Sequence, residues 1–248
     1  SRSAVLENSI MRLDTIIRTE IDPDALPAEY RAYFTELKAR IGLIASGCRE
    51  FIELSKLAGT LLGLEKDKRY LLVFQNNNEL RASGGFIGSF ALIDWRDAGI
   101  INLEVPAGGS YDTEGGLREI ISAPAPLHLV NPVWHFWDAN WWPDWSRSAK
   151  KLAWFYEKSG GPTVDGVISF TPTVFEKILK TIGPVDMRPE YDLVIDADNF
   201  WAEVQDLAEQ KPDVTKQPKK IIGDLLGKII TILPERLSKP GSLRRRPG

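Results

Sequence analysis

The sequence predicts an α/β domain with a mixed central sheet covered by helices, preceded by an N-terminal helical hairpin. Residues 5–62 repeat apolar side chains at spacings of three and four, which is typical of helices. Three short apolar runs follow between residues 69 and 105, and helical and strand-like segments then alternate from residue 146 to 187. Such alternation is typical of a sheet with helices packed on it. We expect two parts, residues 1–65 and residues 66–248.

The N-terminal part contains two helical patterns. The first covers residues 5–21, and the second covers residues 30–62 with the alternating spacing of a heptad repeat. Pro23 and Pro27 separate them, Gly63 is a candidate C-cap, and Gly42 and Gly47 are expected to interrupt or bend the second helix. We interpret this part as a membrane-proximal stalk that packs on itself or on the body of the protein, and through which the protein could oligomerise.

Three strands are predicted next, at residues 69–75, 86–95 and 100–105, with a tight turn at residues 96–99. The segment from residue 106 to 143 has little periodicity and is rich in glycine and proline. Five of the eight tryptophans lie between Trp134 and Trp145. Because long irregular segments inside a compact domain are uncommon, we expect this one to carry function.

The remaining elements follow from local patterns and from their flanking residues. A helix is expected from residue 146 to the glycines at 160–161, capped by Asp144 or Ser146. The others are a strand at 164–170, a helix opening at 171–173 and ending at 183–184, a strand at 185–187, a helix from 196 to about 209, a Pro- and Lys-rich linker at 211–220, and an amphipathic helix at 221–237. We expect this last helix to pack on its own domain.

Composition excludes several classes of protein. A net charge of −3 argues against a nucleic-acid binder, and a single cysteine, Cys48, excludes an intramolecular disulfide and a cysteine zinc site. No apolar run is long enough to span a bilayer, and Ser1 is not an initiator methionine, which is consistent with a targeting segment upstream. The common nucleotide, zinc and serine-hydrolase motifs are absent from the sequence. His128 and His135 are expected to serve packing or loop hydrogen bonding.

A polar, glycine-bearing stretch at residues 75–88, QNNNELRASGGFIG, lies between the first two predicted strands. Amides, a carboxylate, a guanidinium and a hydroxyl gather there, where glycines let the backbone approach a ligand. The stretch is either a ligand-binding segment or an Asn-rich turn with a surface salt bridge. If it binds a ligand, Arg81 is its main candidate.

A second candidate segment, residues 137–145, places Asp138 and Asp144 on either side of Asn140 among large aromatic rings. The indoles would lower the local dielectric constant or form a platform for sugar or lipid. Asp144 alone is most simply a helix N-cap, so Asp138 is the sharper candidate. An acidic pair opposite Arg81 would suit a pyrophosphate held by the guanidinium and by carboxylate-bound Mg²⁺.

Three ordered motifs resemble a bacterial family catalogued as domain of unknown function 4012. They are residues 70–86 (YLLVFQNNNELRASGGF), the segment DANW at 138–141 with Pro143-Asp144, and VDGVI at 164–168 with Gly-Pro-Val at 183–185. The resemblance covers residues 68–187. It implies an exported cell-envelope protein, anchored by a transmembrane helix that would precede Ser1, and therefore an extracytoplasmic location.

The same order of elements is more distantly similar to the LytR-CpsA-Psr domains. Those are extracytoplasmic phosphotransferases that move glycopolymers from a polyprenyl-pyrophosphate carrier to the cell wall, using arginines, aspartates and Mg²⁺. On this resemblance Arg81 matches the arginine of their first Arg-Ser-Asp-Thr motif, and Ser83-Gly84 stands where that motif has its aspartate. Their second motif is echoed at residues 110–113, by Asp112 without an arginine.

The resemblance implies a domain that binds a polyprenyl-pyrophosphate-linked glycan and that, if it is an enzyme, also transfers it. An enzyme of this kind would be a Mg²⁺-dependent glycopolymer phosphotransferase. The expected roles are the following: Arg81 grips the diphosphate, Glu79 orients Arg81, Asp138 with Asp112 or Asp144 holds Mg²⁺, and Asn78, Ser83 and Asn140 complete the ligand-binding set. The alternative is a non-catalytic envelope module for binding or assembly, and an intracellular hydrolase is a third, more distant hypothesis.

Overall fold

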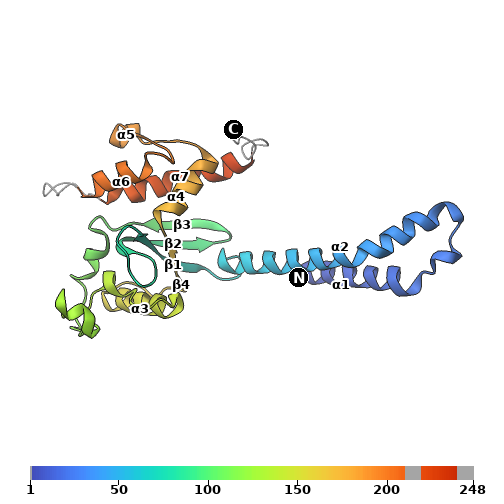
Figure 1. Cartoon of the computed structure of the whole chain (residues 1–248), viewed down its shortest axis with the longest axis horizontal. Helices are drawn as coiled ribbons and strands as arrows, with labels where there is room; N and C mark the ends of the chain where they lie inside the picture. Colours follow the sequence, from blue (N-terminus) through green and yellow to red (C-terminus); the bar gives the residue numbers. More distant parts are fainter. Residues whose placement is uncertain (1, 210–218, 239–248) are drawn as a thin grey trace. The chain divides into compact units, whose positions relative to one another are not determined.

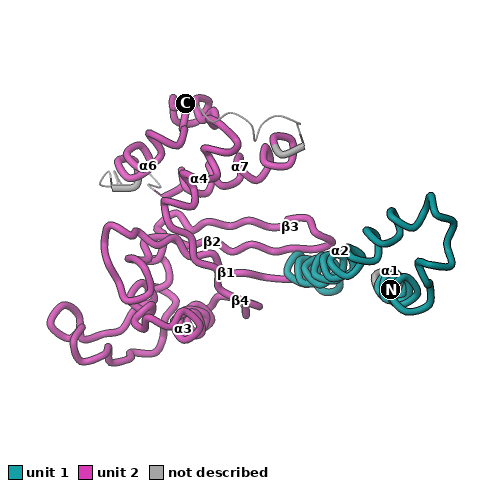
Figure 2. The backbone as a smooth tube through the Cα atoms, turned by 45° about the vertical axis from the view of Figure 1, so that its right-hand side comes forward, with its two compact units in different colours: residues 1–67 teal, residues 68–248 magenta. Residues whose placement is uncertain are grey.

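The computed structural model describes residues 2–209 and 219–238. It divides into two compact units, residues 1–67 and residues 68–248, shown in teal and magenta in Figure 2. The division falls two residues beyond the position expected from the sequence. Each unit is described below by itself.

Unit 1 is a helical hairpin. It consists of α1 (Arg2–Thr15), a π-helical turn η1 (Ile16–Glu20), a short 3-10 turn η2 (Pro23–Ala25) and the long helix α2 (Ala28–Leu61). The side chain of Asp22 caps η2 by accepting from the Asp24 amide at 3.0 Å. Ile17, Ile41, Ala45 and Ile52 are buried within the unit. The predicted hairpin is confirmed.

Helix α2 runs without interruption through Gly42 and Gly47, so the expected interruption does not occur there. Figure 1 shows that the axis of α2 changes direction along its length, which agrees with the other expectation, a bend. A Cβ at Gly42 would meet the guanidinium of Arg18, the movable end of a half-exposed side chain. Arg18 pairs with Asp14, one turn earlier, through a 2.8 Å bond from its Nε.

Unit 2 is built on a four-stranded mixed sheet in the order β3-β2-β1-β4. The strands are β1 (Lys68–Asn76), β2 (Phe86–Arg96), β3 (Gly99–Glu104) and β4 (Gly166–Phe170). β1 pairs antiparallel with β2 and parallel with β4, and β2 pairs antiparallel with β3. The predicted α/β class, mixed sheet and strand order along the chain are confirmed.

Helices cover both faces of this sheet (Figure 1). Helix α3 (Trp145–Lys158) covers one face, and α4 (Pro172–Ile182), α6 (Phe200–Glu209) and α7 (Lys220–Ser238) cover the other. The alternation of side chains along β1 accounts for this. Leu71 and Val73 pack in the cluster that includes α3, whereas Leu72 packs with Leu226 and Ile230 of α7. The last helix packs on its own domain, as expected.

The strand predicted at residues 185–187 forms, but it does not join the central sheet. β5 (Val185–Asp186) pairs antiparallel with β6 (Val194–Ile195), and the one-turn helix α5 (Arg188–Tyr191) connects them. Gly183, with a φ of 83°, ends α4 and redirects the chain. This small sheet packs with α4, α6 and α7 in one apolar cluster.

The irregular segment at residues 106–143 is buried in part, at residues 134–136 and 139–140, and exposed in part, for example at Ile120, Leu129 and Val130. It contains three 3-10 turns, η3 (Gly109–Thr113), η4 (Ala125–Leu129) and η5 (Phe136–Asp138), and an isolated bridge between Ser122 and Val133. Trp134, Phe136 and Ala139 are buried in the cluster beneath α3. Its sequence shows no period because turns, not helices or strands, position these side chains.

Across residues 2–209 and 219–238, no helix is long and apolar enough to cross a membrane. Most of the Pro- and Lys-rich linker predicted at residues 211–220 lies outside the described residues, although Lys219 and Lys220 are described. The arginine-rich tail at residues 244–246 also lies outside them.

Candidate functional site

The connection from β1 to β2, residues 77–85, is here called the motif loop. The buried side chain of Gln75 fixes it from inside, since its Oε1 accepts from the Gly85 amide at 3.0 Å and its Nε2 donates to Ser83 Oγ at 3.4 Å. Gly84 has a φ of +143°, and a Cβ on Gly85 would lie 2.1 Å from a backbone oxygen of β1. Both positions therefore require glycine.

Two asparagines also hold the motif loop. Asn76 accepts from the Asn78 amide at 3.0 Å and donates to Glu79 Oε1 at 3.1 Å. Asn140, which is 1% exposed, donates from Nδ2 to the Gly85 carbonyl at 2.8 Å. The predicted ligand-binding residues Ser83 and Asn140 thus position the loop, and Asn78 takes part through its backbone.

Arg81 and Asp138 meet, as the sequence led us to expect. Arg81 Nε lies 3.9 Å from Asp138 Oδ1, and the guanidinium carbon lies 5.2 Å from the centre of the Phe86 ring. Burial raises the pKa of Asp138, while the charges of Arg81 and His135 and a hydrogen bond from Trp137 oppose the rise. The pair brings the Trp-rich segment against the motif loop.

Glu79 was expected to orient Arg81, and the structure places it differently. Its carboxylate accepts from Asn76, and its charge acts on Lys219. Asp138 is the carboxylate that lies beside Arg81. The reason is local, because Asn76 is three residues before Glu79 in a tight turn, and its side-chain amide lies within hydrogen-bonding distance of the Glu79 carboxylate.

The other two predicted acidic residues, Asp112 and Asp144, have hydrogen-bond partners of their own. Asp112, in η3, accepts from the Gly108 amide at 2.8 Å. Asp144 is the N-cap of α3 and accepts from the Ser146 amide at 2.9 Å, which confirms the capping interpretation. Both carboxylates thus have a local structural partner.

The described part of the chain contains no group of three or more His, Cys, Asp or Glu side chains that could hold a metal ion. The two aspartates predicted to bind Mg²⁺, Asp138 and Asp112, are engaged by Arg81 and by a backbone amide respectively. Mg²⁺ prefers a nearly octahedral set of oxygens, with several waters retained. Mg²⁺ binding stays a prediction.

An apolar pocket of about 200 Å³ lies between the sheet and the helices α4, α6 and α7. Aromatic and aliphatic side chains dominate its lining: Phe74, Phe86, Phe170, Phe175, Phe200, Trp201, Val204, Ile222 and Leu225. Asn76 and the exposed Glu79 also line it, so the predicted binding segment, residues 75–88, supplies part of the pocket wall. The sequence did not predict this pocket in position or size.

Ser89 lines the same pocket and has an unusual environment. The residue is 2% exposed, and its hydroxyl has no hydrogen-bond partner among the described residues. Buried hydroxyls are nearly always paired in native proteins, with protein, water or ligand. Ser89 therefore adds a polar residue to a lining that is mostly apolar.

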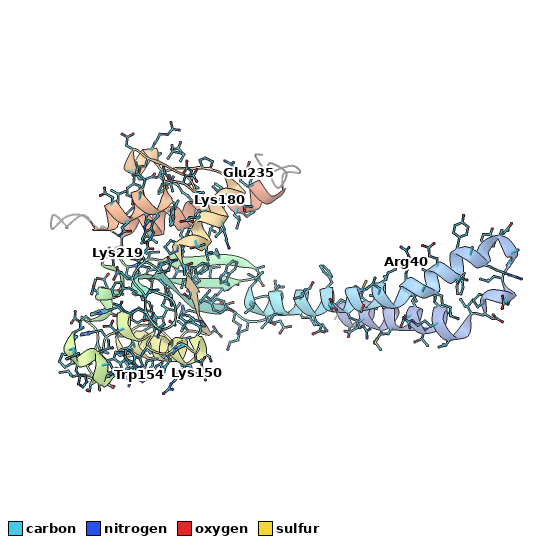
Figure 3. The ribbon with its side chains drawn as sticks, viewed as in Figure 1. Arg40, Lys150, Trp154, Lys180, Lys219 and Glu235 are labelled. Carbon is cyan, nitrogen blue, oxygen red and sulfur yellow. The ribbon has the colours of Figure 1, made fainter. Side chains whose placement is uncertain are left out.

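Lys219, which precedes α7, is a charged residue at the pocket that sequence reasoning missed. Figure 3 shows it between the helices α6 and α7 and the sheet. Its ammonium group donates to the Gly88 carbonyl and lies 5.4 Å from the centre of the Tyr111 ring. Burial lowers the pKa of Lys219, and the charges of Asp112 and Glu79 oppose this. Its sequence context, a lysine-rich linker, contains no signal that distinguishes it.

The fold and the site define an α/β domain with an apolar pocket at one end of a mixed sheet and a charged loop at the rim of that pocket. The chain belongs to the family described as protein of unknown function (DUF4012), whose profile matches residues 65–208, more than half of the chain. The match includes the motif loop, Asp138 and most of the pocket lining. Neither curated proteins nor solved structures gave a match.

Proposed function

We propose that the α/β unit binds a polyprenyl-pyrophosphate-linked glycan, with Arg81 contacting the diphosphate and the apolar pocket taking part of the lipid chain. The observation that supports this most is the position of the pocket, which is lined by Asn76, Glu79 and Phe86 at the edge of the motif loop. A charged loop beside an apolar pocket matches a ligand that has an anionic group next to a hydrocarbon chain.

The volume of the pocket limits what can enter it. A closed apolar cavity of roughly 150 Å³ accommodates benzene, so about 200 Å³ suits a short portion of a chain rather than a whole lipid. Burial of hydrocarbon stabilises a complex by about 25 cal/mol per Å² of apolar surface before the losses of association are counted. The rest of the chain would lie outside the pocket.

The exposed ring of Tyr111, with the half-buried ring of Trp137 beside it, would contact the glycan. Tyr111 is 51% exposed, and its ring centre lies 4.7 Å from that of Trp137, which stacks on His135 at 4.3 Å. Flat aromatic faces with a polar edge suit a ligand that is partly apolar and partly hydrated, as a sugar ring is. The proposal includes an extracytoplasmic, membrane-anchored setting in the bacterial cell envelope, which rests on the family resemblance alone.

The proposal is tested by measuring binding of geranylgeranyl pyrophosphate, a short soluble polyprenyl pyrophosphate, to the purified chain. Arg81→Gln should weaken binding about tenfold or more, because a hydrogen bond to a charged group is worth about 1.5–3 kcal/mol. Arg118→Gln, at an exposed arginine of the same unit, is the matched control and should bind normally. The proposal fails if the unmodified chain does not bind, or if Arg81→Gln and Arg118→Gln bind equally.

Binding rather than transfer is the function that the site geometry supports better. A phosphotransferase of the kind predicted needs clustered acidic residues, and here Asp112 and Asp138 contact different partners. We therefore expect no transfer of a labelled glycan from its polyprenyl-pyrophosphate carrier to an acceptor, with or without Mg²⁺. Transfer that requires Mg²⁺ and is lost in Asp138→Asn would establish the enzyme instead.

A second candidate function, assembly through the hairpin, is favoured by the surface of α2. Large apolar side chains remain exposed along it at near-heptad spacing: Tyr30, Tyr33, Leu37, Ile44, Phe51, Leu54 and Leu61. Sedimentation of the chain over a range of concentrations tests this candidate. Phe51→Asp should dissociate an oligomer formed through α2, whereas a chain that is monomeric at all concentrations would remove homo-oligomeric assembly from consideration.

A further inference from the structure

Two cations lie beside neighbouring residues at the start of β2. Arg81 stands over the Phe86 ring, at 5.2 Å. Lys219 donates to the carbonyl of Gly88, two residues further along the strand. A Cβ built on Gly88 would lie 3.6 Å from Lys219 Nζ and 3.7 Å from Phe86 Cε1, so the amine and the ring face the same small space. Phe86 and the Gly88 position thus lie between the two cations.

The pairing of β1 with β2 explains why this space exists. Phe74 pairs with Ser89 and Gln75 pairs with Ile87, so Gly88 has no partner on β1. The register shift is a β-bulge, a feature that is over-represented beside functional sites because it redirects the backbone. Here it turns the Gly88 carbonyl toward Lys219 and leaves the glycine position open for the amine.

A second series of contacts connects the same two cations on the other side. Lys219 lies 5.4 Å from the Tyr111 ring, and Tyr111 contacts Trp137 with ring centres 4.7 Å apart. Trp137 precedes Asp138, which lies 3.9 Å from Arg81. These contacts and those through Phe86 form a closed circuit. Arg81 and Lys219 are thus connected twice, through Phe86 and through Tyr111, Trp137 and Asp138.

The ammonium group of Lys219 has capacity for a ligand. It carries three donors, and the Gly88 carbonyl accepts from it. Asp112 and Glu79 act on it through their charge, and burial lowers its pKa, so the charged form lacks full compensation in the free protein. A bound anion would supply that compensation.

We propose that Arg81 and Lys219 form a two-cation clamp in which each contacts one phosphate of the same diphosphate, so that the site selects polyprenyl diphosphates over monophosphates. This inference rests on the proposed function and adds to it a second anion-binding residue and a preference between two ligands. The physical basis is the number of phosphate groups in the ligand. A monophosphate can contact only one of the two cations, whereas a diphosphate can contact both.

The test compares geranylgeranyl pyrophosphate, geranylgeranyl monophosphate and geranylgeraniol on the whole chain. The unmodified protein should bind the diphosphate about tenfold or more tightly than the monophosphate, because the diphosphate makes one more charge-assisted hydrogen bond. Lys219→Met should bring the two affinities to within about twofold, and Lys219→Arg should restore most of the preference. Lys220→Met is the matched control, because Lys220 pairs with Asp224 on α7, and it should keep the full preference.

The outcomes separate the two proposals. Equal affinity of the unmodified chain for both phosphates, or a full preference in Lys219→Met, overturns the clamp and leaves lipid binding intact. Failure of every polyprenyl ligand to bind overturns the proposed function and the clamp with it. Thermal unfolding of each variant shows whether it is folded, and a Lys219→Met protein that unfolds like the unmodified chain but has lost its preference supports the clamp.

Discussion

The two faces of the central sheet are packed differently, although the same strands supply both. Beneath α3, aromatic rings pack against one another. The centre of the Phe90 ring lies 5.3 Å from that of Phe136 and 5.6 Å from that of Tyr156, and the ring centres of Trp134 and Phe155 are 5.6 Å apart. On the opposite face, Phe74 and Phe175 also make ring contacts, at 5.7 Å, yet a pocket of about 200 Å³ remains. The α3 face also has a pocket, of about 330 Å³, but Glu104, Asp112 and Ser159 line it together with Phe90, Leu92 and Tyr156, whereas the lining of the 200 Å³ pocket is mostly apolar.

The difference is informative because apolar space is energetically unfavourable to keep open. A residual apolar cavity destabilises a protein by roughly 24 cal/mol per Å³, so a closed void of this size would cost at most about 5 kcal/mol. Access of water reduces this figure. We propose that ligand binding offsets this cost.

The largest expected effect comes from truncating one leucine on each face. Leu152 of α3 is 0% exposed and packs in the apolar cluster between α3 and the sheet. Leu225 of α7 is 1% exposed and lines the apolar pocket on the other face. Leu152→Ala should lower the free energy of unfolding by about 2–5 kcal/mol, and Leu225→Ala should fall at or below the lower end of that range. Leu225 has fewer packed atoms to lose, because one side of it faces open space.

Denaturant unfolding of both variants measures the two losses. Both residues are leucines and almost completely buried, so the two substitutions remove the same atoms and differ only in how tightly the surroundings are packed. An equal or larger loss for Leu225→Ala would mean that the pocket face is as tightly packed as the other, and the contrast between the faces would be wrong.

A smaller effect is expected from two buried polar residues at the site. Asn140→Ala removes the donor to the Gly85 carbonyl and should destabilise the protein by about 1–3 kcal/mol. Ser89→Ala removes a hydroxyl that has no partner in the described chain and should be nearly neutral. Thermal and denaturant unfolding decide the point, and a large loss from Ser89→Ala would show that this hydroxyl has a structural partner.

The smallest predicted effect is a pH dependence that comes from Lys219. Burial lowers its pKa in the folded protein below the unfolded value of about 10.4, so between these pKa values the unfolded chain binds more protons. Stability contributed by this group therefore rises with pH in that window and is reduced at neutral pH. Asp112 and Glu79, which face the amine, oppose the shift without reversing it.

Unfolding of the unmodified chain and of Lys219→Met at neutral and alkaline pH tests this sign. The stability of Lys219→Met relative to the unmodified chain should be greatest at neutral pH and should decrease as the pH approaches about 10. A relative stability that is constant, or that increases with pH, would contradict the prediction.

Much of the fold could be predicted because it depends on local periodicity. The alternation along β1 and β2 and the heptad spacing of α2 are visible within one element at a time. The separate β5–β6 pair could not be predicted in the same way, because two-residue strands carry no period. The irregular segment around Trp134 was recognised as unusual, but its role in the core depends on turns that the sequence does not mark.

The parts of the candidate site that lie within short sequence motifs could be predicted. The parts that depend on contacts between residues far apart in the sequence could not. Arg81 and Asp138 stand in short, chemically distinctive segments, and their pairing was expected. Asn140 was expected to contact ligand, and it holds Gly85 instead, since an amide suits either role. Lys219 was missed because it is 131 residues from the Gly88 carbonyl that it contacts, and its position depends on how α7 packs.

The most direct test of the central claim fills the pocket from α6. Val204 is 7% exposed and lines the pocket, so Val204→Phe should place its ring in the open space with little strain. We predict that this variant unfolds at the same temperature as the unmodified chain or at a higher one, and binds geranylgeranyl pyrophosphate about tenfold or more weakly. Unchanged binding by a folded Val204→Phe protein would show that the lipid chain does not enter this pocket.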